Sequence, residues 1–194
     1  MPNWCYNHLN VYGKLDFLSD FRDFFYKKSA ESAEGTFEGG LFEAFSPIDG
    51  VNDTNWYERH LTHWGTKWDV RLEELDVNDY DDSLHLKFHT AWSPPIPFVS
   101  TLSLLYPNLH FALHFREDGM CFGGTSIAYR GVSVVSKVDF SDISYPDDCA
   151  PGDDAWDDVT EQINLKLEGA EIEAEAQFLK EMLFHGEKFG YEDD

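Results

Sequence analysis

The chain has 194 residues, of which 42% are hydrophobic and 16% aromatic, and its 37 acidic and 14 basic residues give a formal net charge of -23. This length and apolar content fit one folded domain with an appendage and exclude a disordered acidic chain. The charge repels nucleic-acid phosphates and anionic lipid, so we expect neither direct nucleic-acid binding nor membrane binding. It attracts proteins with a basic surface, although the same acidity also serves solubility alone.

The first third of the chain predicts a strand, a helix and a long irregular connection. Apolar and polar residues alternate over 3–12 and predict a strand, and apolar residues at spacings of three and four predict an amphipathic helix over 14–28. The small, polar and glycine-rich segment 29–40 predicts a loop. Residues 41–54, which contain Pro47 and several turn signals, are expected to be irregular.

The middle of the chain predicts two helices and two strands. A short helix is expected over 55–64, a strand over 68–76 and an acidic turn over 78–83. Residues 83–90 alternate clearly and predict a further strand. A helix follows over 95–105 with proline at its start, where the first backbone amides need no partner within the helix.

Three more strands are expected, over 108–116, 120–129 and 132–139. The order strand, helix, strand, strand, helix, strand is that of a ferredoxin-like split βαβ sandwich. We therefore predict an α+β fold of this type with extra antiparallel strands, in a domain that spans residues 1–139. Its helices are expected to cover one face of the sheet and to leave the other face open.

Residues 140–194 are expected to form an acidic loop and a helical extension. From Asp139 onward the chain carries 18 of its 37 acidic residues and only three basic ones. Apolar residues at spacings of three and four predict one helix over about 157–185, or two helices that separate near Gly169. Two placements stay open: the extension covers the open face of the sheet, or it projects away toward a basic partner.

The cysteines and the N-terminus indicate the compartment. Cys5, Cys121 and Cys149 are odd in number and widely spaced, which argues against a disulfide framework or a zinc site and favours reduced thiols. The N-terminal residues lack the basic and apolar regions of a signal peptide, and no apolar run is long enough to cross a bilayer. We therefore expect a cytoplasmic protein.

Three stretches together resemble a known family. They are MPNWC with Asn7, the NW pair followed by HWGTKWD, and FHTAWSPPIP with LSLLYPNLHF. Over about residues 1–130 the chain resembles the YubB-like proteins of bacteriophages and conjugative plasmids. The resemblance implies a ferredoxin-like domain, a mobile-element origin and a location in the host cytoplasm. It implies no established reaction and no assigned catalytic residue, so it bears on architecture more than on function.

Five histidines are expected to gather on the open face of the sheet. In a ferredoxin-like sheet the first strand lies between the third and the last, which places outward residues of three strands side by side. Such a surface can bind a metal through imidazoles, or a nucleotide by ring stacking, or it consists only of the outward positions of half-exposed strands. No carboxylate or thiolate lies among these histidines at ligand spacing, which weakens the metal alternative. The set is His8, His85, His89, His110 and His114, with Tyr6, Tyr12, Lys87 and Arg116 on the same face.

A second candidate ligand site is the corner formed by Trp64, Lys67, Trp68 and Asp69. A glycine between two tryptophans allows a sharp turn, and the two charged residues can then contact a ligand beside aromatic faces. The alternative is a structural corner in which the tryptophans cap the core and Lys67 pairs with Asp69. The segment lacks the spacing of a phosphate-binding loop.

A third candidate is an acidic run near the start of the extension. Its carboxylates can imitate phosphate spacing and occupy the basic groove of a partner, or they form a solvated tail. Calcium loops need alternating oxygen ligands and a central glycine, and the run does not fit that pattern. The expected partner-binding residues are Asp147, Asp148, Asp153, Asp154, Asp157 and Asp158.

Catalytic motifs are missing from the sequence. There is no GxSxG elbow, and Cys5 and His8 lie three apart on a strand and so face opposite sides. We therefore expect no enzyme, no cofactor and no metal. The leading hypothesis is a mobile-element accessory protein that binds and inhibits a host nucleic-acid-handling or defence protein through an acidic, nucleic-acid-mimicking surface. The alternative is a nucleotide- or small-ligand-binding module, and a third hypothesis is a metal-dependent hydrolase. The oligomeric state stays open.

Overall fold

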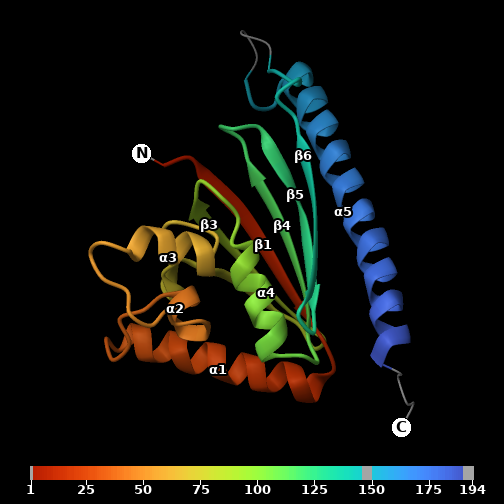
Figure 1. Cartoon of the computed structure of the whole chain (residues 1–194). Coiled ribbons are helices and arrows are strands. Elements are labelled where there is room, and N and C mark those ends of the chain that lie inside the picture. Colours follow the sequence, from red (N-terminus) through yellow and green to blue (C-terminus); the bar gives the residue numbers. More distant parts are fainter. Residues whose placement is uncertain (1, 146–149, 190–194) are drawn as a thin grey trace.

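The computed structural model of the protein describes residues 2–145 and 150–189, with side chains as far as Phe184. A six-stranded sheet in the order β2-β3-β1-β4-β5-β6 forms its centre, and every neighbouring pair is antiparallel (Figure 1). The strands are β1 Trp4–Tyr12, β2 Asp76–Asp79, β3 Ser83–Ala91, β4 His110–Glu117, β5 Phe122–Tyr129 and β6 Val132–Asp139.

The helices lie on both sides of this sheet. The first four cover one face, and the long C-terminal helix lies on the other side, against β5 and β6 (Figure 1). They are α1 Leu15–Ala33, α2 Leu41–Phe45, α3 Trp56–His63, α4 Ile96–Leu105 and α5 Asp154–Phe189, with one 3-10 turn at Leu72–Glu74.

The four strands β2-β3-β1-β4 have the ferredoxin-like order. The path from β1 through α1 to β2 leaves room for β3 between the two strands, and the path from β3 through α4 to β4 encloses β1. β5 and β6 extend the sheet beyond β4. The predicted α+β fold with a ferredoxin-like sheet and extra antiparallel strands is confirmed. The division at residue 139 stays a prediction.

The core lies between the sheet and α1 to α4. Alternate residues of each strand point into it, so that Leu9 pairs with Leu86 and Leu113 and all three are fully buried. From α1, Phe21 fills the same layer and contacts the ring of Phe111 at 6.0 Å between centroids. The alternation that predicted the strands therefore places their apolar side chains on one face of the sheet, and burial of that face forms the core.

The predicted end of the first helix was five residues too early. The hydroxyl of Ser29 donates to the carbonyl of Phe25 at 3.1 Å, and Lys28 pairs with Glu31 at 2.7 Å. These local contacts keep a small, polar segment helical as far as Ala33. The helix then gives way to Gly35, whose φ of 71° suits a glycine.

The strand predicted over 68–76 was wrong. Residues 68–75 are irregular apart from a 3-10 turn, and the strand forms instead at Asp76–Asp79, whose last two residues were expected to lie in an acidic turn. The apolar residues that suggested a strand, Val70 and Leu72, are buried in the core from an irregular backbone. Asp76–Asp79 pairs with β3, and only the residues between β2 and β3 form the turn.

Helix α5 is a single helix that continues through Gly169. One stripe of it is buried, and the small Ala170 and Ala174 let the helix approach the sheet closely. Burial of Ile163 and Phe178 on either side offsets the cost of the glycine, about 1 kcal/mol in a helix interior. Of the two placements left open by the sequence, the structure shows α5 packed on the sheet (Figure 1).

Among the described residues, no helix has both the length and the apolar character needed to cross a membrane.

Candidate functional site

A groove of about 640 Å³ lies between α5 and the half of the sheet that α5 leaves uncovered. Its floor is the outward face of β1, β3 and β4, one margin is α5, and the other margin is the segment that leads into β2. Tyr6, His8, Lys87, His89, His114 and Arg116 line the floor, Asn164, Leu167, Glu168 and Glu171 line the α5 margin, and Glu74 and Asp76 line the other.

The strand register brings the floor residues together. His8 lies opposite Lys87 on β3 and opposite His114 on β4, and Tyr6 lies opposite His89 and Arg116. Because side chains of paired residues share a face, these six point out of the same surface. The juxtaposition expected from the strand order is therefore present for these residues.

The five predicted histidines fall into two groups. His8, His89 and His114 line the groove, whereas His85 lies outside its lining and meets both His8 and Tyr80, at 5.5 and 5.1 Å between ring centroids. His110 stacks on Tyr129 at 3.9 Å and meets Phe178 of α5, so it lies beside the helix and stays exposed. Neither His85 nor His110 belongs to the lining of the groove.

The imidazole of His8 is held in its neutral form. Burial lowers its pKa, and the neighbouring His114, His85 and Lys87 lower it further. Burial also lowers the pKa of His110, with a smaller contribution from Arg130. Among the described residues, no group of three or more histidine, cysteine, aspartate or glutamate side chains is arranged to hold a metal ion.

The margins of the groove carry more charge than its floor. Four carboxylates line the margins, against the two cations Lys87 and Arg116 on the floor. Lys87 faces Asp76 at 3.9 Å, and Glu171 lies 3.9 Å from the imidazole of His114. With the histidines left out of the count, the groove has an excess of negative charge, which favours a cationic group over a phosphate.

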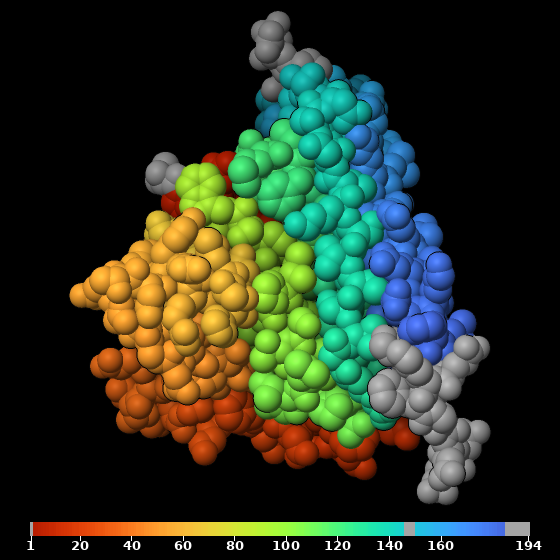
Figure 2. Space-filling model, in the orientation of Figure 1, coloured from red at the N-terminus to blue at the C-terminus, as the bar shows by residue number. Residues whose placement is uncertain are grey.

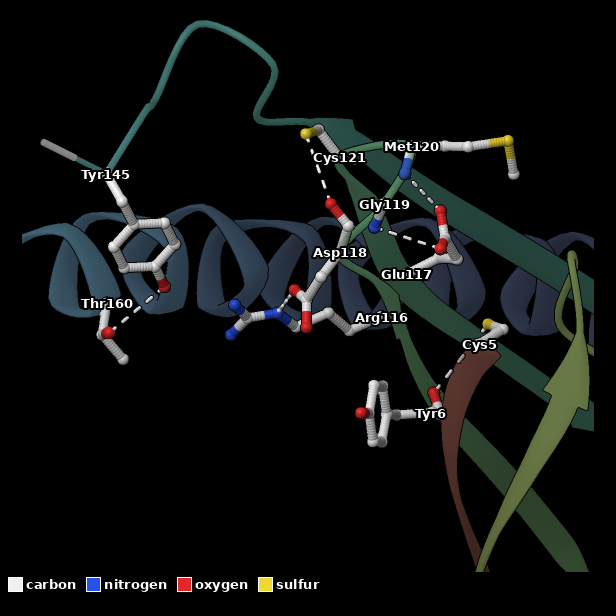
Figure 3. A network of polar contacts seen from close by, with 10 residues as sticks. All are labelled: Cys5, Tyr6, Arg116, Glu117, Asp118, Gly119, Met120, Cys121, Tyr145 and Thr160. Carbon is white, nitrogen blue, oxygen red and sulfur yellow. Dashed lines mark hydrogen bonds and ion pairs between the residues drawn. The ribbon is translucent and has the colours of Figure 1, made fainter. Parts of the chain in front are cut away.

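Arg116 is held at one end of the groove by the turn between β4 and β5. Its guanidinium pairs with the carboxylate of Asp118 (Figure 3). The turn is fixed in part by Glu117, a buried carboxylate that accepts the backbone N–H groups of Gly119 at 3.1 Å and Met120 at 2.5 Å. The floor cation at this end is therefore already paired and well positioned.

Cys5 lies near this turn but does not have the properties of a nucleophile. Its side chain is fully buried, and burial raises the pKa of the thiol to about 12. The reactive form of cysteine is the thiolate, so Cys5 is an inert core residue at neutral pH. Cys5 and His8 lie three positions apart on β1 and so point to opposite faces, which places the thiol on the face covered by α1 to α4.

The corner that contains Trp64 and Asp69 has structural contacts throughout. The carboxylate of Asp69 accepts backbone N–H groups of Gly40, Phe42, Glu43 and Val70 at distances from 2.7 to 3.0 Å, and so caps α2. Burial raises the pKa of Asp69, and the four N–H groups oppose that shift.

The other corner residues complete this structural arrangement. Trp64 is buried, and its indole N–H donates to the carbonyl of Ser46 at 2.9 Å. The ammonium of Lys67 lies over Trp68 at 4.4 Å and Trp56 at 5.9 Å, and these rings take the place that was expected for Asp69. The predicted ion pair between Lys67 and Asp69 was therefore wrong, and the corner has no free carboxylate to offer a ligand.

The predicted acidic run divides between two environments. Asp147 and Asp148 lie outside the described residues. Asp153 accepts the backbone N–H of Ala150 at 2.8 Å just before α5 begins. Asp154, Asp157 and Asp158 are exposed in the first turns of α5, where negative charge is favoured by the helix dipole. Part of this acidity therefore stabilises the helix start, and the remainder is open to a partner.

Sequence reasoning missed the acidic margins of the groove. Asn164, Glu168 and Glu171 recur at spacings of four and three, which places them on one side of a helix, beside its buried stripe. That signal was present in the sequence. Glu74 and Asp76 gave no such signal, because their segment was assigned to the wrong strand.

Known proteins support the fold and the family. The family model for the ferredoxin-like domain in Api92-like proteins matches residues 63–164, which extends into α5. The solved structure of protein Api92 from Yersinia pseudotuberculosis matches with a TM-score of 0.51 at 10% identity, covering 73% of this chain and 99% of that one. No curated protein matches. The chain therefore belongs to the family of Api92-like proteins with a ferredoxin-like domain.

Proposed function

We propose that this chain is a non-enzymatic binding protein for a partner with a basic surface, and that the groove receives an extended, basic segment of that partner. The observation that carries the proposal is the placement of carboxylates on both margins, Glu74 and Asp76 on one side and Glu168 and Glu171 on the other. A lysine or arginine side chain that enters between them meets opposite charge on either side.

The floor of the groove suits such a side chain as well. Tyr6 is 52% exposed and meets the ring of His89 edge to face, at 4.6 Å between centroids. Aromatic faces attract guanidinium and ammonium groups, by about 0.5–1 kcal/mol at exposed sites. The two floor cations, Lys87 and Arg116, are paired with Asp76 and Asp118, which weakens their repulsion of an incoming base.

The finer identity of the partner is part of the same proposal. The resemblance to YubB-like proteins supports a mobile-element origin and a place in the host cytoplasm. Proteins that handle nucleic acid carry basic surfaces, so a host nucleic-acid-handling or defence protein is the partner class that the net charge of -23 favours. Inhibition of that host protein follows if the acidic surface occupies its basic groove.

The test is a titration with basic peptides. A fluorescein-labelled extended peptide of alternating arginine and glycine is titrated with the full chain, and binding is followed by fluorescence anisotropy at low and moderate salt. We expect the double variant Glu74→Gln/Glu171→Gln, which removes one carboxylate from each margin, to bind about tenfold more weakly.

The matched control removes the same charge elsewhere. Asp20 and Asp23 are exposed on α1, on the other side of the sheet. Asp20→Asn/Asp23→Asn is expected to change the affinity less than twofold. Equal weakening by both double variants would show that the peptide senses only overall charge, and the groove would then have no special role.

A second candidate function is supported by the ring pair of Tyr6 and His89. A flat, uncharged ring, such as a nucleobase without phosphate, can stack on this pair. A thermal-shift series separates the two candidates, since a bound ligand raises stability by about 2.7 kcal/mol at 100 times its Kd. A shift with nucleosides that Tyr6→Ala abolishes would support the second candidate, and no shift with any of them would exclude it.

A further inference from the structure

The outer side of α5 carries an apolar stripe that the fold leaves uncovered. Leu165, Ile172 and Leu179 recur at every seventh residue and are 59%, 67% and 63% exposed. Leu183 continues the stripe and is 72% exposed. α5 forms an outer edge of the molecule beside β6 (Figures 1 and 2).

This stripe is opposite the one that holds α5 to the sheet. The buried stripe runs through Ile163, Ala170 and Ala174, which fall on the other side of a helix with 3.6 residues per turn. A helix that needed only to cover the sheet would carry polar residues on its outer side. Four large aliphatic side chains in line, over a length of about 27 Å, instead form a surface suited to another helix.

Gly169 and Ala176 complete the pattern between the large residues. With them, the stripe has alternating spacings of four and three, which is the spacing of a helix-pairing seam. Small residues at these positions let a second helix approach closely. Nothing packs near Gly169 within the described structure, since a Cβ built there meets no atom within 4 Å.

The charge beside the stripe specifies the partner. Glu161, Glu168 and Glu175 also recur at every seventh residue, are exposed, and form a row along one border of the stripe. In helix pairs the residues that border the seam decide which partner binds. We propose that the outer stripe of α5 docks an amphipathic helix of another protein, with apolar residues in its seam and lysine or arginine beside them.

A second copy of this chain is a poorer occupant. In an antiparallel pair of α5 helices, the row of glutamates would face its own copy, and like charges across a seam oppose pairing. The net charge of -23 adds repulsion between two whole chains. A basic amphipathic helix satisfies the same apolar stripe without this conflict.

The probe is a pair of synthetic 21-residue helical peptides with identical leucines at alternating spacings of three and four. One carries lysine beside the leucines and the other glutamate, and a scrambled form of the lysine peptide tests nonspecific attraction. Binding to the full chain is followed by fluorescence anisotropy. We expect the lysine peptide to bind at least tenfold more tightly than either of the other two.

Variants of the chain assign the binding to the stripe. Ile172→Glu is expected to weaken binding of the lysine peptide at least tenfold, although it adds a negative charge that attracts lysine. The matched control Gln177→Glu adds the same charge at an exposed position outside the stripe and is expected to leave the affinity within twofold. Circular dichroism checks that both variants keep their helix content.

The outcomes distinguish this site from the groove. Glu74→Gln/Glu171→Gln changes the groove and leaves the stripe intact, so it is expected to bind the lysine helix as the wild type does. Failure of the wild type to prefer the lysine helix, or equal binding by the Ile172→Glu and Gln177→Glu variants, would overturn the proposal. A dimer in sedimentation that Ile172→Glu dissociates would also overturn it, because the stripe would then be a contact between copies.

Discussion

The two faces of the sheet differ in what their side chains can still do. On the helix side, Leu9, Leu86 and Leu113 are fully buried beneath α1 to α4. On the other side, α5 packs mainly against β5 and β6, and most outward residues of β1, β3 and β4 remain around a groove. The same alternation along each strand produces both faces, so burial alone does not mark the site. The site is marked instead by the part of the outer face that α5 leaves uncovered.

The largest expected effect is the loss of stability caused by a substitution in the core beneath α1 to α4. Phe111→Ala is expected to lower the free energy of unfolding by about 3–5 kcal/mol, because it removes a fully buried ring from the core. Tyr6→Ala on the groove side is expected to change it by less than about 0.5 kcal/mol. Urea denaturation measures both. Similar losses for the two variants would show that the groove face is part of the core.

The next effect concerns the corner. Asp69→Ala is expected to cost about 3 kcal/mol of stability, because several backbone N–H groups of the α2 cap lose a charged acceptor. Asp69→Asn keeps one acceptor oxygen and is expected to cost less. Peptide binding in the groove should survive both substitutions at temperatures where the chain stays folded. A ligand whose affinity fell with Asp69→Asn at unchanged stability would restore the corner as a binding site.

The strands differ in how well they could be predicted from the sequence. The strands around His8, His85 and His114 were predicted because apolar and polar residues alternate along most of their length. The strand at Asp76–Asp79 was missed because three of its four residues are polar with low strand preference, and only pairing with β3 makes it a strand.

The site was predictable only in part. The gathering of His8, His89 and His114 could be predicted from the strand order. The acidic α5 margin of the groove could not be predicted in this way, because it depends on where α5 lies on the sheet. The cap formed by Asp69 joins residues 26 to 29 positions apart and has no signature in the local sequence.

The smallest effect is a pH dependence that arises from two histidines on the α5 side of the sheet. Burial holds the pKa values of His8 and His110 below the ordinary 6.5, so the unfolded chain takes up protons that the folded chain does not. Their contribution to stability is present above about pH 6.5 and is lost as the pH falls below it.

Urea denaturation at pH 7.5 and pH 5.5 measures this contribution. The double variant His8→Asn/His110→Gln is expected to lose less stability between these pH values than the wild type. The difference between the two proteins isolates the histidines from the carboxylates, which titrate in both. An identical loss in both proteins would show that neither imidazole is held neutral.

Binding of a basic segment in the groove between α5 and the open sheet face can be followed residue by residue. The experiment is a nuclear magnetic resonance titration of the isotope-labelled chain with the arginine–glycine peptide. We expect the amide signals of Tyr6, His8, His114 and Glu171 to shift together and saturate, while those of Asp20 and Asp23 on α1 do not move. Shifts spread evenly over exposed acidic residues, with the groove unchanged, would contradict it.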